Sequence, residues 1–324
     1  MPALTPARAA SVATTIALAL VPGLSVAAPA AAARGDAAAA THWQPRQIAY
    51  EGRHGIWVMN ANGTHKRHLG RGRAPAWSPD GRKIAYLRHG AVWVMRADGS
   101  RAHRVAKRAD EAPRWSSDGH LLAYGYRGCI WLIHADGSDR RGFREPAADP
   151  GWSPRGHKIA YTSYLDEDNA NGDVWIIHAD GTHVHRVARH GSSPAWSPNG
   201  HRITYEASNW DGPSEIWVMS DDGTSKIRLA SDGGPDADPA WAPGGGRIAY
   251  TAMYGGVWVL KADGTGKHRA AKNGYYPAWS PSGRQIAYQA FGAHGTSVWV
   301  VRPNGTHRHR VAKSAASPSW RPRH

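Results

Sequence analysis

The stretch Pro75-Ala-Trp-Ser-Pro-Asp-Gly-Arg-Lys-Ile-Ala-Tyr86 decides the fold, because close copies of it recur along most of the chain. Pro79 presets φ for the first central position of a turn, and Gly81 can adopt the left-handed conformation that a short connection between strands needs. Trp77 comes before this turn and Ile84-Ala85-Tyr86 follows it, and both segments suit a half-buried strand. The stretch therefore predicts a β-hairpin.

The repetition carries more information than the hairpin, since two strands cannot bury a face alone. The tryptophan of the motif recurs at Trp77, Trp115, Trp152, Trp196, Trp241, Trp279 and Trp320. A segment of the form Ile-Trp-Val follows each Ile-Ala-Tyr-like triplet and leads into an Asn-Gly or Asp-Gly pair, which is a strong hairpin signal. A short basic segment comes last, as in His103-Arg-Val-Ala-Lys107. Four strands in each repeat of about 40 residues are typical of a β-propeller blade.

The two ends of the repeat array complement each other. Ile48-Ala49-Tyr50 lacks a proper Trp-turn strand before it, whereas Ser317-Pro-Ser-Trp320 has the Trp strand and nothing after it. If the terminal strand completes the first blade, the ring closes and an open sheet edge is removed. The sequence thus predicts an all-β, seven-bladed propeller over residues 42–324, with six blades as the alternative.

The amino-terminal segment has the pattern of a secretory signal peptide. Arg8 precedes an apolar run from Ala9 to Val21, and small residues follow at Ser25-Val-Ala-Ala28. We expect cleavage after Ala27 or a few residues later, a disordered Ala-rich leader over residues 28–41, and export to the periplasm or the extracellular space. The run is too short and too rich in Ala and Thr to span a bilayer comfortably.

Composition narrows the classes of partner and chemistry. The formal net charge of +15 favours anionic surfaces in general. The single cysteine, Cys129, excludes an internal disulfide and a cysteine-based metal cluster. The 16 Trp against 2 Phe indicate one structural role for Trp that is reused in every repeat.

The repeat resembles a known family. The pattern Pro-X-Trp-Ser-Pro-Asp-Gly-X-X-Ile-Ala-Tyr, followed by Ile-Trp-Val-Met and X-Asp-Gly, is similar to the WD40-like (PD40) repeat of the TolB family of bacterial β-propellers, and it covers His42 to Trp320. The resemblance concerns the propeller alone, without the α/β domain that precedes it in TolB. It implies a periplasmic or secreted protein that binds other proteins through one face of the propeller. The same repeat occurs in propellers attached to prolyl-oligopeptidase-type peptidases.

Catalytic and metal motifs are not evident. The sequence contains no Gly-X-Ser-X-Gly elbow, no His-Glu-X-X-His, no phosphate loop and no dinucleotide fingerprint, so we predict no enzyme and no cofactor. The acidic segment from Asp166 to Asp173 places His178 where a calcium loop needs its closing Glu, which favours a polar surface loop. We interpret the side chains just before the inner tryptophans as small, and small side chains predict an open channel without a ring of ligands. These residues are Ala76, Arg114, Gly151, Ala195, Ala240, Ala278 and Ser319.

The basic fourth segments contain two His-X-His pairs, His183/His185 and His307/His309. On a strand, both rings of a pair would share one face and could hold a transition metal. Lys, Arg and His recur in this segment in most blades, and a basic outer strand resists pairing with the edge of another molecule. We therefore favour a solvated, protective rim, with an anionic envelope polymer or membrane surface as the alternative ligand.

A partner would bind where the loops vary. The second-to-third loops and the inter-blade crossings share one face of the disc, here called the variable face, whereas the Ser-Pro-X-Gly and Asp-Gly turns on the other face are uniform. Acidic and aromatic residues gather in blades four to seven of the variable face, and we predict a partner site there that consists of Tyr164, Asp166, Asp168, Trp210, Asp211, Asp238, Tyr254, Tyr275 and Tyr276. Such side chains suit a cationic peptide or a sugar. Nucleic acid is not expected, because acidic side chains repel phosphate.

The leading hypothesis is an exported, monomeric, non-catalytic propeller that binds a protein or peptide near the channel mouth. One alternative is a protein that binds carbohydrate or an envelope polymer through its basic rim. The other is a propeller-type hydrolase or lyase acting on a sugar or lactone. The last alternative requires a group of His, Asp or Glu side chains that converge inside the channel.

Overall fold

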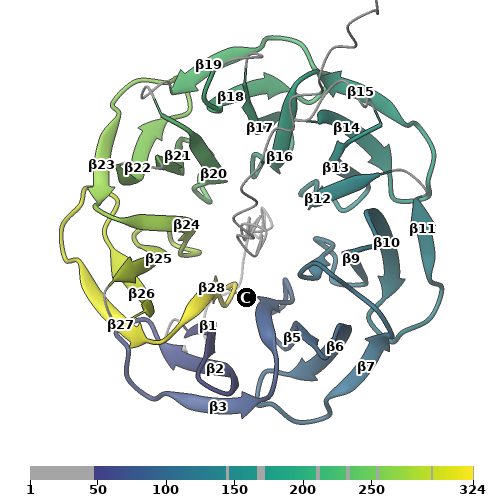
Figure 1. The fold of residues 1–324 in the computed structure, drawn as a ribbon, viewed down its shortest axis with the longest axis vertical. Helices are drawn as coiled ribbons and strands as arrows, with labels where there is room; N and C mark the ends of the chain where they lie inside the picture. Colours follow the sequence, from purple (N-terminus) through teal and green to yellow (C-terminus); the bar gives the residue numbers. More distant parts are fainter. Residues whose placement is uncertain are drawn as a thin grey trace, which may run out of the picture.

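The computed structural model describes residues 47–143, 146–165, 172–208, 212–230, 234–252, 255–292 and 295–323. They form seven four-stranded antiparallel sheets, arranged as the blades of a ring around a central channel (Figure 1). The described part of the chain has no helix that could span a membrane. The predicted signal peptide and leader lie outside the described residues.

Each blade is numbered by its place in the chain, and its strands run from the channel outward. Blade 1 contains β28 (Ala316–Trp320), β1 (Gln47–Gly52), β2 (Gly55–Asn60) and β3 (Arg67–Gly70). Blade 2 contains β4 (Arg73–Trp77), β5 (Lys83–Arg88), β6 (Ala91–Arg96) and β7 (His103–Ala106). Blade 3 contains β8 (Arg114–Trp115), β9 (Leu121–Tyr126), β10 (Cys129–His134) and β11 (Arg141–Phe143).

The remaining four blades repeat the same order. Blade 4 contains β12 (Ala147–Trp152), β13 (Lys158–Ser163), β14 (Asp173–His178) and β15 (His185–Ala188). Blade 5 contains β16 (Gly191–Trp196), β17 (Arg202–Ala207), β18 (Glu215–Ser220) and β19 (Ile227–Ala230). Blade 6 contains β20 (Asp236–Trp241), β21 (Arg247–Ala252), β22 (Gly256–Lys261) and β23 (His268–Ala271). Blade 7 contains β24 (Gly274–Trp279), β25 (Ile286–Gly292), β26 (Gly295–Val301) and β27 (His309–Lys313).

The predicted hairpin turn is confirmed at its first copy. Gly81 has φ of 60° and donates its N–H to the Ser78 carbonyl at 2.8 Å. The Ser78 hydroxyl is buried in the turn, where it accepts the Lys83 N–H at 2.9 Å and donates to the Asp80 carboxylate. This serine is therefore a structural part of the turn.

Ring closure follows the predicted route. β28, from the carboxyl end, pairs antiparallel with β1, and Trp320 lies opposite Ile48. Trp320 is fully buried, and the Arg321 guanidinium donates to the Gln47 side chain at 2.8 Å. The seven-bladed prediction is confirmed, and the six-bladed alternative is wrong.

The inner tryptophans link neighbouring blades. Six of them donate the indole N–H, at 2.9 to 3.1 Å, to the carbonyl of the residue just before the inner Trp of the preceding blade: Trp115, Trp152, Trp196, Trp241, Trp279 and Trp320. Trp77 differs, because its buried indole N–H has no hydrogen-bond partner within the described residues. The sheets also pack face to face, so each apolar cluster combines residues of adjacent blades, as Val92 and Tyr124 do.

Candidate ligand-binding site at the channel mouth

A left-handed residue recurs in the innermost strands, three positions before the inner Trp. Its φ lies between 50° and 55° at Ala74, Asp149, Ser193, Asp238, Tyr276 and Ser317. In each case the register with the second strand shifts at this point, as in a β-bulge, and a proline follows. A bulge leaves one residue unpaired and redirects its side chain, and left-handed φ is costly for a residue other than glycine. Four of these side chains, Asp149, Ser193, Asp238 and Tyr276, line a pocket at the channel.

Side chains of the preceding blade accept the backbone N–H groups of these residues. Ser193 donates to Thr162 Oγ1 at 3.1 Å, Asp238 to Glu206 Oε1 at 2.8 Å, and Tyr276 to Thr251 Oγ1 at 3.2 Å. Thr162, Glu206 and Thr251 all directly follow the tyrosine of their second strand. The same position therefore builds both the joint between blades and the channel wall.

In blade 3 a different residue accepts the backbone N–H of the next blade. Its second strand has Gly125 at the acceptor position, and an added Cβ would lie 2.5 Å from Glu111 Cδ. The Glu111 carboxylate occupies that space and accepts the N–H of Asp149. Glu111 thereby enters the channel wall from the segment before the inner strand.

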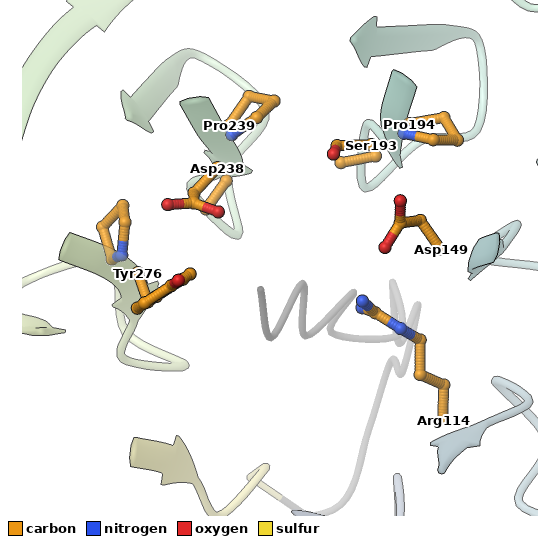
Figure 2. Close-up of a pocket in the computed structure, with 10 residues that line it drawn as sticks. Arg114, Asp149, Ser193, Pro194, Asp238, Pro239 and Tyr276 are labelled. Atoms are coloured by element: carbon orange, nitrogen blue, oxygen red, sulfur yellow. The ribbon is translucent and has the colours of Figure 1, made fainter. Parts of the chain in front are cut away.

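Four carboxylates from four consecutive blades consequently meet at the variable-face end of the channel. These channel acids are Glu111, Asp149, Glu206 and Asp238, from blades 3, 4, 5 and 6. A pocket at this mouth is lined by Arg114, Asp149, Ser193, Asp238 and Tyr276, with Pro194, Pro239 and Pro277 behind them (Figure 2). Figure 2 shows the Arg114 guanidinium extended toward the Asp149 carboxylate, with Asp238 and Tyr276 across the pocket.

Burial raises the pKa of every channel acid, and repulsion from a neighbouring carboxylate adds to this at Glu111, Glu206 and Asp238. For Glu111 the pKa rises to about 7, mainly through burial and then through the negative charge of Asp149. Burial also raises the pKa of Glu206, and the Asp238 charge raises it further. For Asp149 burial is again the main cause, opposed by Arg114 and by the Thr162 hydroxyl, which donates to it. Burial lowers the pKa of Arg114 against the opposing effect of the acids.

Two tyrosines border the channel acids. Tyr164 is 40% exposed, and its pKa rises to about 12 through burial and through the charges of Asp149, Glu111 and Glu206. The pKa of Tyr276 also rises to about 12, because of burial and of Asp238 and Glu206. Aromatic faces beside carboxylates bind cations through both charge and the ring quadrupole.

The structure brings together part of the predicted partner site. Tyr164, Asp238 and Tyr276 lie around the channel mouth, and Tyr275 makes an edge contact with Phe291 at 5.2 Å between ring centroids. Five predicted residues lie outside the described residues: Asp166, Asp168, Trp210, Asp211 and Tyr254.

Sequence reasoning missed the acidic character of the channel. The residues directly before the inner Trp do not indicate it, although Arg114 at that position reaches the pocket. The expectation of a channel without converging acids is therefore wrong. The informative positions are the residue before the proline of Pro-X-Trp and the residue after the second-strand tyrosine, which yield Asp149 and Glu206.

The described residues contain no group of three or more His, Cys, Asp or Glu side chains that could hold a metal ion.

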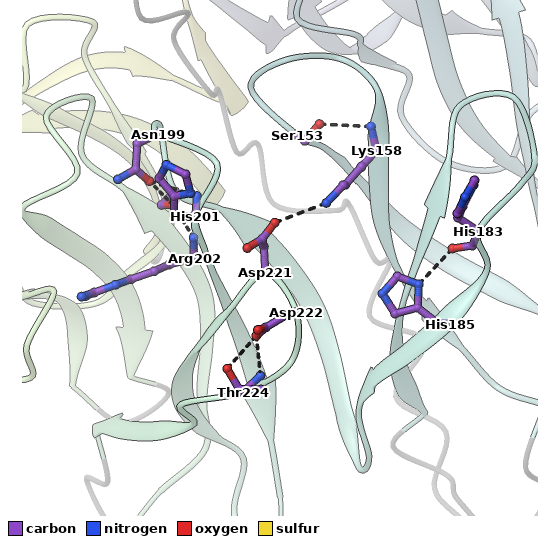
Figure 3. A network of polar contacts seen from close by, with 11 residues as sticks. Ser153, Lys158, His183, His185, Asn199, His201, Arg202, Asp221, Asp222 and Thr224 are labelled. Carbon is purple, nitrogen blue, oxygen red and sulfur yellow. Dashed lines mark hydrogen bonds and ion pairs between the residues drawn. The ribbon is translucent and has the colours of Figure 1, made fainter.

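The two His-X-His pairs do not lie as two rings on one face of a strand. His183 lies in a turn with φ of 56°, and its carbonyl accepts a hydrogen bond from His185 Nδ1 at 2.9 Å (Figure 3). His307 and His309 repeat this arrangement. Because the first His precedes the strand, the two rings of a pair do not share a strand face.

The face opposite the variable face is uniform, as predicted. In the Asp-Gly turns, the Asp222 carboxylate accepts both the N–H and the hydroxyl of Thr224, and the same contacts recur at Asp98 and Ser100 (Figure 3). Asp221 accepts from Lys158 at 3.3 Å across blades 4 and 5. These contacts serve turns and blade packing.

The channel acids predict how stability depends on pH. Since their pKa values are higher in the folded than in the unfolded chain, the folded state binds more protons between about pH 4.5 and pH 8, and stability falls as the pH rises. We expect Glu206→Gln to reduce this fall in stability, because it removes one carboxyl that titrates in this range. The amide oxygen keeps the acceptor for the Asp238 N–H, as Gln289 accepts the Ser317 N–H at the same position of blade 7. Melting temperatures across that range measure the effect.

Asp98→Asn is the control for this prediction. The Ser100 hydroxyl and N–H lower the pKa of Asp98, so this carboxylate is ionised in both states over the same range. An Asp98→Asn protein should keep the parental slope. An unchanged slope in Glu206→Gln would show that this carboxyl is not buried at the channel.

Comparisons with known proteins agree with the fold. Residues 132–276 match the family model described as the TolB beta propeller domain (PD40). TolB from Acinetobacter baumannii superposes with a TM-score of 0.58 at 16% identity, over 86% of this chain and 67% of that chain. A comparison with curated proteins found no match.

Two further solved structures are enzymes with the same fold. An oligogalacturonate lyase in complex with manganese has a TM-score of 0.63 at 15% identity, over 76% of this chain and 82% of that chain. The oligogalacturonate lyase of Vibrio parahaemolyticus has a TM-score of 0.60 at 10% identity, over 83% and 85%. At these identities the likeness establishes the fold and leaves the function to be argued from the site.

Proposed function

We propose that the protein is an exported recognition propeller that binds a cationic segment of a protein or peptide in its channel mouth. The convergence of the four channel acids carries the proposal. The Arg114 guanidinium interacts with two of them, Asp149 and Glu111, and the formal net charge of the whole protein is +15. The signal-peptide pattern of residues 1–27 supports export.

The physical reason is the repulsion among the channel acids, which Arg114 offsets only at Glu111 and Asp149. Burial and a neighbouring carboxylate raise the pKa of Glu206 to about 8 and that of Asp238 to about 6. A lysine or arginine side chain in the mouth would pair with the ionised forms and lower their pKa values. Tyr164 and Tyr276 would flank the cation with aromatic faces. Binding should therefore release protons and strengthen from about pH 5.5 to pH 8.

Fluorescence anisotropy with two labelled peptides tests the proposal. One is Gly-Lys-Arg-Gly, and the other is its neutral counterpart, in which acetyl-lysine replaces Lys and citrulline replaces Arg. We expect the charged peptide to bind and the neutral peptide to bind at least about tenfold more weakly. Asp149→Asn with Asp238→Asn should weaken the charged peptide about a hundredfold, because two carboxylates are lost. Asn tolerates the left-handed backbone of both positions, so the fold should be retained.

The matched control is Asp139→Asn with Asp221→Asn, which changes net charge equally at two sites away from the channel. This control should bind within about twofold of the parent. Equal binding of the charged and neutral peptides would refute the proposal, as would equal losses in both double variants.

The second candidate is acid–base catalysis on an acidic sugar. It is favoured by one observation, the Glu111 carboxyl with a pKa near 7 in the same cluster as the Arg114 guanidinium. A group with such a pKa can transfer protons at neutral pH, and a guanidinium can hold a substrate carboxylate. Incubation with oligogalacturonate, with ultraviolet detection of an unsaturated product, decides between the candidates. Peptide binding without formation of the unsaturated product would exclude the lyase reaction on this substrate.

A further inference from the structure

A second pocket lies on the outer side of the ring, between blades 7 and 1. Blade 1 contributes Tyr50, Gly52, Arg53, Trp57 and Lys66, and β27 of blade 7 contributes Arg310, Val311, Ala312 and Lys313. We call it the rim pocket. It forms only when the first and last blades meet, and it is separate from the channel acids.

The rim pocket is cationic. Arg53, Lys66, Arg310 and Lys313 line it, and no carboxylate does. None of these four side chains forms an ion pair within the part of the chain that the structure describes. Other rim cations do have partners, since Arg186 pairs with Asp173 at 2.8 Å and Arg228 with Glu215 at 3.3 Å. The positive charge of the rim pocket is therefore uncompensated there.

Trp57, like Trp217 of blade 5, has no lysine or arginine over its ring in the described part of the chain, whereas the third-strand Trp of the other five blades has one. In blades 3, 6 and 7 a cationic side chain covers the third-strand Trp, and it comes three positions after the glycine of the Asp-Gly or Asn-Gly pair. The distances from the cationic group to the ring centroid are 3.7 Å for Arg140 over Trp131, 5.2 Å for Lys267 over Trp258 and 4.3 Å for Arg308 over Trp299. Lys66 has this position in blade 1, but no Lys or Arg among the described residues lies over the Trp57 ring. Lys66 and Trp57 instead line the same pocket.

We infer that the rim pocket binds an anionic saccharide. The His68 ring lies against Trp57 at 5.0 Å between ring centroids, and a sugar ring can stack on the part of Trp57 that His68 leaves uncovered. The sulfate or carboxylate groups of the sugar can pair with Lys66, Lys313 and the two arginines. The charges surround one aromatic ring, which suits a ligand with its anionic groups on the ring itself. A nucleic acid strand would instead need cations along a groove and several stacking platforms.

Microscale thermophoresis with a labelled heparin-derived hexasaccharide tests this inference. The parent protein should bind it in a salt-dependent manner and should not bind maltohexaose, which is neutral. Lys66→Gln with Lys313→Gln should weaken binding at least about tenfold, because two charge-assisted contacts are lost. A desulfated hexasaccharide that keeps its carboxylates distinguishes the two anionic groups; retained binding assigns the site to carboxylate and lost binding to sulfate.

The matched control is Lys226→Gln with Lys272→Gln, which changes the same two blade positions in blades 5 and 6. All four lysines are exposed, so both double variants should keep the parental melting temperature. Equal losses in the two variants would overturn the inference, because they would indicate general attraction to a basic protein. Tighter binding of a single-stranded DNA dodecamer than of the hexasaccharide would also overturn it.

Discussion

Deleting residues 317–324 should unfold most of the protein. The deletion removes nearly all of β28, and with it the innermost strand of blade 1 and the fully buried Trp320. Loss of a buried Trp side chain alone costs about 3–5 kcal/mol, and domains of ordinary stability have about 5–15 kcal/mol in total. The deletion also exposes the inner edge of β1 and removes the hydrogen bond from the Trp320 indole to the Ala278 carbonyl, at 2.9 Å.

Circular dichroism and urea unfolding measure this effect. Deletion of residues 322–324, which follow β28 and Arg321, is the control and should leave the free energy of unfolding within about 0.5 kcal/mol of the parent. A synthetic peptide that carries residues 315–323 should restore folding to the longer deletion in trans. An unchanged midpoint in the longer deletion would contradict a stabilising role for the closing strand.

Trp241→Ala should have the second largest effect, a loss of about 3–5 kcal/mol in the free energy of unfolding. Trp241 is 6% exposed, packs between blades 5 and 6, and donates its indole N–H to the Ala195 carbonyl at 3.1 Å. The substitution leaves a cavity between two blades and removes one of the two side-chain hydrogen bonds to the Ala195 carbonyl, the other being from the Thr204 hydroxyl at 3.2 Å. Urea unfolding gives the loss directly.

Phenylalanine substitutions separate the hydrogen bond from the packing. Trp77 is 5% exposed, about as buried as Trp241, but its indole N–H has no partner in the described residues. Trp241→Phe should therefore cost about 1 kcal/mol more than Trp77→Phe, which is the contribution of a typical hydrogen bond. Equal costs would show that the indole hydrogen bonds do not stabilise the ring.

The sequence was sufficient for the architecture because each blade is built from local signals. Pro79 and Gly81 specify a turn, the apolar triplets specify strands, and the period of about 40 residues specifies their number. Even ring closure could be predicted, since Trp320 without its triplet and Ile48-Ala49-Tyr50 without its Trp strand are visible in the chain. The function of the inner tryptophans as links between blades follows from the same repetition.

The site depended on tertiary structure. Glu111, Asp149, Glu206 and Asp238 lie up to 127 positions apart, and they meet only because four blades converge on one axis. A bulge in the innermost strand decides the direction of Asp149 and Asp238, and Glu111 enters only because Gly125 leaves room for it. The rim pocket likewise needs blades 7 and 1 side by side. Local sequence signals determine the strands and turns of each blade. The charge and shape of the channel mouth and the rim pocket depend on contacts between blades, and the separation of two residues in the sequence does not give their distance in space.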